Sequence, residues 1–309
     1  MLLFIQTPLS ETNRTALRQQ LEPRHSLMFR SELTADEQAT ALQQADVLLG
    51  NPPADWLRQA TNLKFWQLDS AGFNNYSHLN LSIPVANMGD YFAWPCAETI
   101  VAAILALYRR IDELARLQAE KRWVGAPLRY TMRTLHQQRV VILGAGTIGQ
   151  AVQSILTGFQ CDIQLMARTN PDAQIHTHEQ LLAALPTTDL LINCLPGTVD
   201  KFVSAEVLGA MKPGSVFANV GRGNTADELA LIDALQRGHL GGAALDVTAV
   251  EPLPADSPLW AIPNVVLTQH TAGGQQTEDE GKINLFVRNL ARIEQGEVPE
   301  NLVDLRRGY

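Results

Sequence analysis

One short segment constrains the fold more than any other: an apolar run, Val140-Val141-Ile142-Leu143, leads directly into three glycines spaced as GxGxxG. A helical pattern follows, and this strand–turn–helix context separates the motif from an ordinary glycine-rich turn. The glycines permit a tight turn and let a pyrophosphate approach the N-terminus of the helix. The segment therefore predicts a dinucleotide site, and the residues expected to bind the cofactor there are Gly144, Gly146, Thr147, Ile148 and Gly149.

Short apolar runs alternate with helix-length amphipathic segments along all 309 residues. This rhythm predicts strand–helix–strand units with parallel sheets, and the length suits about two domains. We predict an α/β protein of two Rossmann/flavodoxin-like domains, in which a cofactor domain at 95–281 is inserted into a substrate domain at 1–94 plus 282–309. The strands are expected at 2–5, 26–29, 47–49, 65–68, 139–143, 162–166, 190–193, 216–219, 243–246 and 265–268.

Several helix boundaries follow from local signals. Capping boxes predict helix starts at 34–37, 177–180 and 225–228. The longest helical pattern, at 94–120, is expected to be one helix that leaves the first domain and enters the second. The last helix is expected near 279–295, and the tail after it could pack back on the first domain.

Charge and cysteine usage exclude several classes of protein. The formal net charge of −8 argues against a nucleic-acid or anionic-membrane surface as the main partner. Cys96, Cys161 and Cys194 match neither a metal-ligand spacing nor a CxxC pair. The start lacks a basic n-region, and its apolar run is too short for a signal peptide. We therefore expect a cytoplasmic protein without a metal, a membrane or a nucleic-acid partner.

The end of the second strand of the cofactor domain bears on the choice between NAD and NADP. A carboxylate at this tip would hold the ribose hydroxyls of NAD, but the strand at 162–166 ends in Ala167-Arg168-Thr169. A guanidinium can fork the 2′-phosphate of NADP, and a hydroxyl can add a further hydrogen bond. Arg168 and Thr169 therefore predict NADPH/NADP as the cofactor, with NADH and a solvated surface arginine as the alternatives.

Polar residues follow three further strands, where an open α/β sheet places its ligands. Arg222 stands between glycines, Glu251 lies in a proline-stiffened loop, and His270 closes the last strand segment. The arginine can bind a carboxylate through two hydrogen bonds, and the histidine can donate a proton to a carbonyl oxygen. The glutamate favours the charged form of that histidine. This set suits the reduction of a 2-oxo acid, although each residue alone would more often be structural.

At this point the sequence resembles the D-isomer-specific 2-hydroxyacid dehydrogenases over nearly the whole chain. The weaker motifs lie outside the middle region, at 70–72, 97–98 and 301–309. Arg168 and the terminal motif are most similar to the glyoxylate and hydroxypyruvate reductase branch. The strong motifs are Gly144 to Gly149, Met211 to Ser215, Asn219 to Gly223, Ala244 to Val247, Glu251 to Pro254 and Thr268 to Gly273.

The resemblance implies a role for each matched residue. His270 would be the acid/base, Glu251 its partner, and Arg222 the substrate anchor. The backbone N–H groups of Ala71 and Gly72 would complete the substrate site. A homodimer is also implied. The further residues expected to bind the cofactor are Leu195, Pro196, Val220, Gly221, Asp246 and Gly273.

Three departures from the family pattern concern the site. Gln269 stands where the family usually has Pro before the histidine, and the segment at 196–201 is shorter than usual. The Asp that the family usually has after the substrate-loop glycine is replaced in Phe73-Asn74-Asn75-Tyr76. The other histidines lack the context of His270 and are interpreted as structural.

The function expected from these features is NADP-preferring reduction of small 2-oxo acids, such as glyoxylate or hydroxypyruvate, to D-2-hydroxy acids. One alternative is a nucleotide-sensing interaction protein on the same fold, as in the similar corepressors. The other is an NAD-dependent 2-hydroxyacid dehydrogenase.

Overall fold

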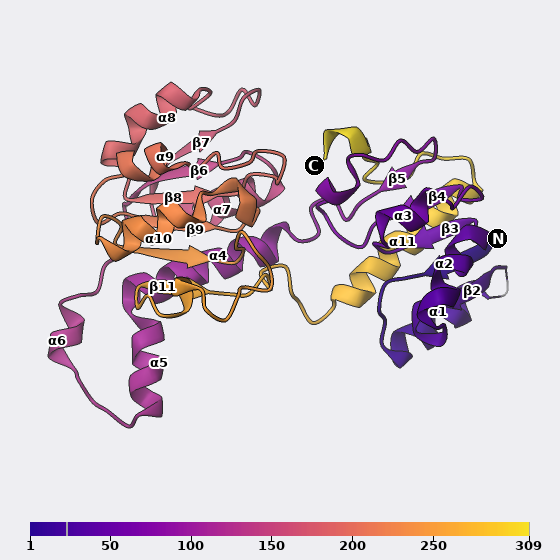
Figure 1. Cartoon of the computed structure of the whole chain (residues 1–309), viewed down its shortest axis with the longest axis horizontal. Coiled ribbons are helices and arrows are strands. Elements are labelled where there is room, and N and C mark those ends of the chain that lie inside the picture. Colours follow the sequence, from indigo (N-terminus) through magenta and orange to yellow (C-terminus); the bar gives the residue numbers. More distant parts are fainter. Residues whose placement is uncertain (23, 309) are drawn as a thin grey trace. The chain divides into compact units, whose positions relative to one another are not determined.

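The structure is a computed structural model that describes residues 1–22 and 24–308. The chain forms two compact units (Figure 1). The first contains Met1–Tyr91 together with the segment from Gln275 onward, and the second is Phe92–Gly274. The boundaries expected after residues 94 and 281 therefore lie a few residues too far along the chain. The second unit is inserted between the two segments of the first.

The first unit is built on a parallel sheet of five strands in the order β2-β1-β3-β4-β5. Its strands pair in register, with Leu3 opposite both Leu27 and Val47. The strands are β1 (Leu2–Ile5), β2 (Ser26–Phe29), β3 (Val47–Leu49), β4 (Phe65–Gln67) and β5 (Val85–Ala86), and the helices are α1 (Glu11–Leu21), α2 (Ala35–Gln44), α3 (Ala54–Leu57) and α11 (Glu278–Glu294).

Alternate residues of these strands supply two separate cores, as the strand period of two requires. Phe4, Leu48 and Trp66 pack with the helices α2 and α3 on one face. Leu3 and Ile5 pack with α1 and α11 on the other. Because both faces are covered, the strands read as nearly continuous apolar runs.

The C-terminal segment completes the first unit. Val303 N donates to Val85 O at 2.9 Å, and Leu302 forms an antiparallel bridge with Ala86. The side chain of Leu305 is buried beside the core that contains Phe4. The expectation that the tail packs back on the first domain is confirmed.

The second unit is built on a parallel sheet of six strands in the order β11-β10-β9-β8-β6-β7. The strands are β6 (Arg139–Leu143), β7 (Asp162–Met166), β8 (Leu190–Asn193), β9 (Val216–Asn219), β10 (Gly242–Leu245) and β11 (Val265–Leu267). The helices are α4 (Ala93–Arg109), α5 (Ile111–Ala119), α6 (Ala126–Arg129), α7 (Thr147–Thr157), α8 (His178–Ala184), α9 (Ala205–Ala210) and α10 (Glu228–Gln236).

Helices cover both faces of this sheet. Val140 and Ile142 of β6 pack with α4 and α7. Val141 and Leu143 of the same strand pack with α8, α9 and α10. The two parallel-sheet α/β domains predicted from the sequence are confirmed, and the second has its strand order reversed between β6 and β8, where dinucleotides bind in such folds.

The long helix expected at 94–120 is interrupted. It divides into α4 and α5 at Arg110, which takes a left-handed conformation with φ 57°. The apolar periodicity continues across the break, through Leu107, Ile111 and Leu114, and therefore concealed it. The helices α5 and α6 form an excursion away from the layered part of the unit (Figure 1).

One of the three predicted capping boxes is wrong. Thr34 with Glu37 and Thr177 with Gln180 form the boxes as expected. The third helix, α10, begins instead at Glu228, and its N-cap is Asp227, whose side chain accepts from Ala230 N at 3.2 Å. Thr225 lies in a 3₁₀ turn and is used elsewhere, as described below.

Among the described residues, no helix is both long enough and apolar enough to cross a membrane.

Candidate active site

The predicted site residues of the second unit follow the carboxyl ends of its strands. Gly144 follows β6, Arg168 follows β7, and Leu195 follows β8. Arg222, Asp246 with Glu251, and His270 follow the three neighbouring strands β9, β10 and β11. Because the strands are parallel, all of these residues belong to one edge of the sheet.

The glycine-rich turn has the geometry that its motif predicts. Gly144 has φ 100°, which favours glycine, and a Cβ there would lie 3.1 Å from Cys194 O. A Cβ on Gly149 would lie 2.0 Å from Gly144 O, so the first turn of α7 can pack on the strand only without a side chain. Two glycines of the motif are therefore required by contacts inside the protein.

Gly146 differs from these two because a Cβ there would meet nothing within 4 Å. It is exposed at the N-cap of α7, where no side chain caps the helix and the first turn holds no acidic residue. The backbone N–H groups of this turn are therefore open to an external anion. The turn fits the pyrophosphate of a dinucleotide.

The end of β7 carries two exposed residues, Arg168 and Thr169. A parallel bridge between Met166 and Ile175 brings the returning chain beside them. The Nδ1 atom of His176 lies 2.8 Å from the carbonyl oxygen of Ala167. This bond holds the imidazole next to the backbone of Arg168, a placement that the sequence did not predict.

A buried amide network fixes the loop that carries Arg222. Asn193 Nδ2 donates to Asn219 Oδ1 at 3.2 Å and to Thr225 Oγ1 at 2.6 Å. Asn219 Nδ2 donates to Arg222 O at 3.2 Å, and Thr225 Oγ1 donates to the same carbonyl. The backbone of Arg222 is therefore held from two sides, which explains why Thr225 does not cap α10.

The glycines that flank Arg222 are sites of close backbone approach. A Cβ on Gly221 would lie 2.4 Å from Leu195 O. A Cβ on Gly223 would lie 1.8 Å from Thr248 O. The Arg222 loop is thus in direct contact with the loops that follow β8 and β10.

The half-buried side chain of Arg222 donates from Nη1 to Gly221 O at 2.8 Å. Its charge acts on the thiol of Cys96 in α4. The pKa of that thiol is raised to about 11, chiefly by burial and also by the charge of Asp246, while the charge of Arg222 acts to lower it. The guanidinium and the Asp246 carboxylate therefore act on one buried group.

Asp246 is buried and anchors the turn after β11. Its Oδ1 accepts from Thr268 Oγ1 at 2.6 Å, from Thr271 N at 3.0 Å and from Ala272 N at 3.1 Å. Its backbone carbonyl accepts from His270 N at 2.6 Å. The carboxylate expected to contact the cofactor thus also determines where His270 stands.

His270 and Glu251 form the hydrogen-bonded pair that the sequence predicts. The distance from His270 Nδ1 to Glu251 Oε2 is 2.6 Å. Glu251 is held in turn through its Oε1, which accepts from Thr248 N at 3.0 Å. Because an ionised carboxylate only accepts, Nδ1 carries a proton and Nε2 is the nitrogen available for proton transfer. The histidine side chain is 50% exposed, so it can be reached from solvent.

The backbone of this turn is unusual. Gln269 has φ 55° and His270 has φ 54°, and both are in the left-handed region. A proline, the usual family residue at position 269, has φ fixed near −65° and cannot adopt this conformation. The departure noted in the sequence is therefore matched by a backbone that excludes the usual residue.

The remaining predicted positions of this unit lie in the same loops. Leu195 N donates to Asn193 Oδ1 at 3.2 Å, Pro196 is half-buried, and Val220 is buried directly after β9. A Cβ on Gly273 would lie 3.0 Å from Phe92. Among the residues that the structure describes, no group of three His, Cys, Asp or Glu could hold a metal ion.

The predicted substrate residues Ala71 and Gly72 belong to the first unit, in the loop after β4. Asn87 Nδ2 donates to Ala71 O at 2.6 Å, and Ser70 Oγ donates to Gly72 O at 2.7 Å. Both carbonyls are thus engaged inside the protein, which orients the peptide groups of the loop.

Comparison with known proteins identifies the family. Residues 101–272 match the family model for the D-isomer specific 2-hydroxyacid dehydrogenase, NAD binding domain. A glyoxylate/hydroxypyruvate reductase B from Serratia proteamaculans is 32% identical over 305 residues, which cover 93% of this chain and 94% of the relative. The chain belongs to the D-isomer-specific 2-hydroxyacid dehydrogenase family.

Further comparisons agree with this assignment. A glyoxylate/hydroxypyruvate reductase A from Salmonella paratyphi B is 33% identical over 238 residues, with 75% of this chain and 74% of the relative covered. The crystal structure of a D-isomer specific 2-hydroxyacid dehydrogenase from Xanthobacter autotrophicus, in complex with NADPH and MES, is similar with a TM-score of 0.81. It is 29% identical and covers 100% of this chain and 99% of that one.

The chain is therefore an oxidoreductase with a nicotinamide-dinucleotide-binding domain, similar to the glyoxylate/hydroxypyruvate reductase branch of the 2-hydroxyacid dehydrogenases. Of the alternatives that the sequence left open, the nucleotide-sensing interaction protein is the one that these relatives do not favour.

Proposed function

We propose that the protein reduces small 2-oxo acids to D-2-hydroxy acids, with NADPH preferred over NADH. The observation that carries the proposal is the pair of His270 and Glu251, 2.6 Å apart, on the same sheet edge as Arg222 and the dinucleotide turn. A sensor of the nucleotide would need the turn but would have no use for this oriented imidazole.

The residues have distinct roles in this proposal. The N-terminus of α7 together with Gly146 would bind the pyrophosphate, and Asp246 would contact the nicotinamide amide. When bound, the reduced nicotinamide supplies the hydride. The guanidinium of Arg222 binds the carboxylate of the 2-oxo acid and polarises its carbonyl. The backbone N–H groups of Ala71 and Gly72 stay predicted substrate contacts of the first unit.

The proton comes from His270. Nε2–H of the imidazolium donates to the carbonyl oxygen as that oxygen gains negative charge. Glu251 keeps its hydrogen bond to Nδ1 throughout, which fixes the orientation of the ring. The neutral ring then recovers a proton from solvent, which reaches it because half of the side chain is exposed.

The preference for NADPH rests on the end of β7. Arg168 is exposed and no acidic partner of its guanidinium is recorded in the described part of the chain, so it is available for a 2′-phosphate. Thr169 follows it, and His176 is hydrogen-bonded to the preceding carbonyl. A cationic, hydroxyl-bearing strand end without a carboxylate favours the doubly charged ligand.

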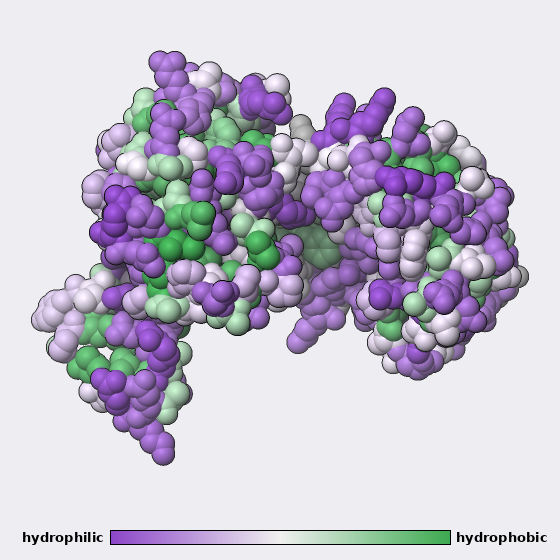
Figure 2. Space-filling model, viewed as in Figure 1, coloured by the Kyte–Doolittle hydropathy of each residue, from purple (hydrophilic) through white to green (hydrophobic). Residues whose placement is uncertain are grey.

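We infer that the protein forms a homodimer through α5, α6 and the loop that joins them. Figure 2 shows apolar surface on this excursion, and Ile111, Trp123 and Tyr130 are exposed there. Large apolar side chains exposed together on one surface are typical of an interface between proteins. Light scattering of the purified protein tests this, and a monomer would contradict it. The cytoplasmic location also stays a prediction.

Turnover tests the main proposal. The purified full chain is mixed with NADPH or NADH and with glyoxylate, hydroxypyruvate or pyruvate, and the loss of absorbance of the reduced nicotinamide is followed. We expect His270→Gln to lower kcat by about 10²- to 10⁴-fold, because general acid catalysis contributes that much. The Kd for NADPH should stay unchanged, since the ring does not bind the pyrophosphate.

His136→Gln is a matched control, because His136 is an exposed histidine of the same unit that bonds only to Gln160. It should retain wild-type turnover. If His270→Gln were as active as the wild type, the assigned acid would be wrong. If the wild type bound NADPH but consumed none with any of the acids, the sensor interpretation would replace this one.

A further inference from the structure

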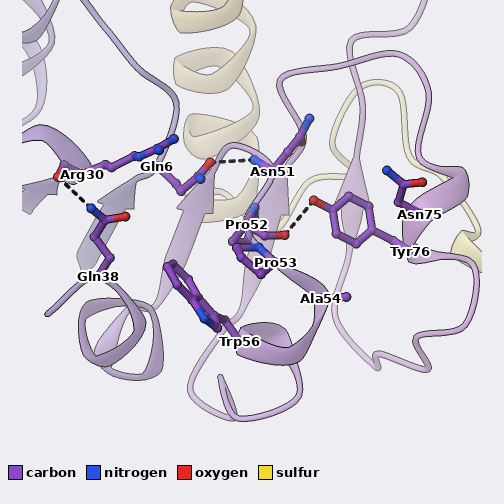
Figure 3. Close-up of a pocket in the computed structure, with 10 residues that line it drawn as sticks. All are labelled: Gln6, Arg30, Gln38, Asn51, Pro52, Pro53, Ala54, Trp56, Asn75 and Tyr76. Carbon is purple, nitrogen blue, oxygen red and sulfur yellow. Dashed lines mark hydrogen bonds between the residues drawn. The ribbon is translucent and has the colours of Figure 1, made fainter. Parts of the chain in front are cut away.

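A cavity lies in the first unit, at the carboxyl edge of its sheet, with a volume of about 480 Å³ (Figure 3). Gln6, Arg30 and Asn51, which line it, follow the neighbouring strands β1, β2 and β3. The order of the strands reverses at β1, and open α/β sheets bind ligands at such a point. No residue of the proposed catalytic or cofactor site lines this cavity.

The lining has the chemistry of an anion site. Arg30 is its only charged residue, and no ion pair or hydrogen bond of the Arg30 guanidinium is recorded among the described residues. Figure 3 shows this side chain extending toward Gln6. Gln6 uses its Oε1 as an acceptor for Asn51 N at 3.0 Å, which leaves its NH₂ group free to donate. The cavity lining therefore offers two donor groups, and the neighbouring carboxylate of Asp69 accepts a hydrogen bond from Thr7 Oγ1 at 2.8 Å.

The rest of the lining combines the amides of Gln38 and Asn75 with aromatic and proline rings. The half-buried indole of Trp56 and the ring of Pro53 form one wall, and Tyr76 stands opposite with its hydroxyl already donated to Pro52 O at 2.8 Å. One guanidinium balances one negative charge, and the aromatic wall suits a carbon skeleton. We propose that this cavity binds a small organic monocarboxylate.

The walls are held in place before any ligand binds. Gly50 has φ 125°, and a Cβ there would lie 2.7 Å from both Gln6 Oε1 and Thr7 N. Trp66 Nε1 donates to Gly50 O at 2.7 Å. The loops after β1 and β3 are therefore packed together. Binding of a ligand should cost little conformational entropy, because these loops are already ordered.

One wall residue also braces the loop proposed to bind the substrate. Asn51 Nδ2 donates to Ser70 Oγ at 3.0 Å, and Asn51 Oδ1 accepts from Asp69 N at 3.3 Å. Ser70 Oγ in turn donates a hydrogen bond to Gly72 O at 2.7 Å. Occupation of the cavity should therefore change the affinity for the 2-oxo acid, and by linkage the substrate should change the affinity for the carboxylate. This coupling between the cavity and the 2-oxo acid rests on the proposed function, in which Gly72 binds the substrate.

Binding is tested first, by calorimetric titration of the full chain with benzoate and with propionate. The Arg222→Gln variant serves as the background, because the proposed substrate anchor is then removed. We expect millimolar or tighter binding that Arg30→Gln weakens by about tenfold or more, the loss expected when a charged hydrogen bond is removed. Arg306→Gln is the matched control, since Arg306 is an exposed arginine of the same unit paired with Asp304.

The outcomes of this titration decide the site. No heat with either carboxylate, or binding that Arg30→Gln leaves unchanged, would overturn the proposal. Equal binding of inorganic phosphate would overturn the carboxylate assignment. Thermal unfolding of each variant confirms that the loss of binding does not come from loss of the fold.

The coupling is tested by steady-state kinetics with glyoxylate and NADPH in the otherwise wild-type chain. Saturating benzoate should change KM for glyoxylate, and Arg30→Gln should abolish this effect. Asn51→Ala should lose the change in KM even at benzoate concentrations that calorimetry shows to saturate this variant, because both side-chain groups of Asn51 contact the loop. A carboxylate that binds without changing KM would overturn the coupling. Absence of any turnover would count against the proposed function, and the titration would still decide the cavity.

Discussion

At the scale of single residues, the site depends on groups that are held by the backbone of a neighbouring loop. Asp246 is the clearest case, because it binds the backbone of Thr271 and Ala272 and also accepts from His270 N. The position of His270, which follows β11, is thus determined by Asp246, which follows the neighbouring strand β10. Substitutions outside the catalytic set should therefore change catalysis through geometry.

Gln269 offers a test of this point. Replacement by proline, the residue that the family usually has, should disrupt the turn, because proline cannot adopt φ 55°. We expect Gln269→Pro to lower kcat with glyoxylate by about tenfold or more, the rate cost of a misplaced acid. The Kd for NADPH should change little, which fluorescence titration would measure. Gln269→Ala is the control and should keep most of the activity, and equal activity of the proline variant would show that the turn has another conformation in solution.

The strand end at Arg168 yields a second prediction, which concerns cofactor choice. Arg168→Gln should raise the Kd for NADPH by about tenfold to a hundredfold, because a charged hydrogen bond to the phosphate is lost. The Kd for NADH should not change. His176→Gln should have a smaller effect of the same sign, and His178→Gln, whose ring packs on Phe202, should have none. Parallel loss of affinity for both cofactors in the Arg168 variant would contradict the assignment.

At the scale of elements, most strands were predictable from the sequence. The predictions failed for one very short strand and for a capping residue whose side chain bonds elsewhere in the fold. The central strands of both sheets, such as β3, β8 and β9, were predictable because they are buried on two faces and therefore read as apolar runs. The strand β5 was not, since Val85–Ala86 is only two residues long and follows a proline. Thr225 matched a capping box, but its hydroxyl bonds to Asn193 and to Arg222 O, and Asp227 caps the helix instead.

The same limit applied to the site. His270, Glu251 and Arg222 were predictable because their spacing and their strand ends agree with a known family. The placement of His176 depends on a parallel bridge between Met166 and Ile175, and the role of Asp246 depends on three hydrogen bonds from another loop. Neither leaves a periodic or compositional signal in the sequence.

The break between α4 and α5 yields a prediction at this scale. Arg110 pays a steric cost for φ 57° that glycine would avoid. Its side chain also contacts Thr131 at 3.3 Å and Glu113 at 3.6 Å, so the fair comparison is between Arg110→Gly and Arg110→Ala, which both lose these contacts. The glycine variant should be more stable than the alanine variant by about 1 kcal/mol in urea unfolding. Equal stabilities would indicate a continuous helix in solution.

At the scale of the whole molecule, each unit has its own cores. The clusters around Phe4 and around Leu3 contain residues of the first unit alone, and those around Val140 and Val141 contain residues of the second alone. Units with separate cores can unfold as separate cooperative transitions.

Calorimetry tests this separation together with the location of the cofactor site. We expect two transitions, of which NADPH raises only one. Saturation at about a hundred times Kd should stabilise the second unit by about 2.7 kcal/mol. The variant Arg168→Gln should lose most of this shift at the same NADPH concentration. A single transition that moves as a whole would show that the units unfold together.

The insertion of the second unit has a consequence for how the protein is made. Residues 92–274 are contiguous, so this unit can acquire its fold on the ribosome once that stretch has emerged. The first unit needs Phe286 of α11 for one core and Leu305 for the other. Its N-terminal strands are synthesised first, but their apolar faces stay exposed until α11 and the segment after it have been synthesised. We therefore expect a chaperone to matter most for these strands.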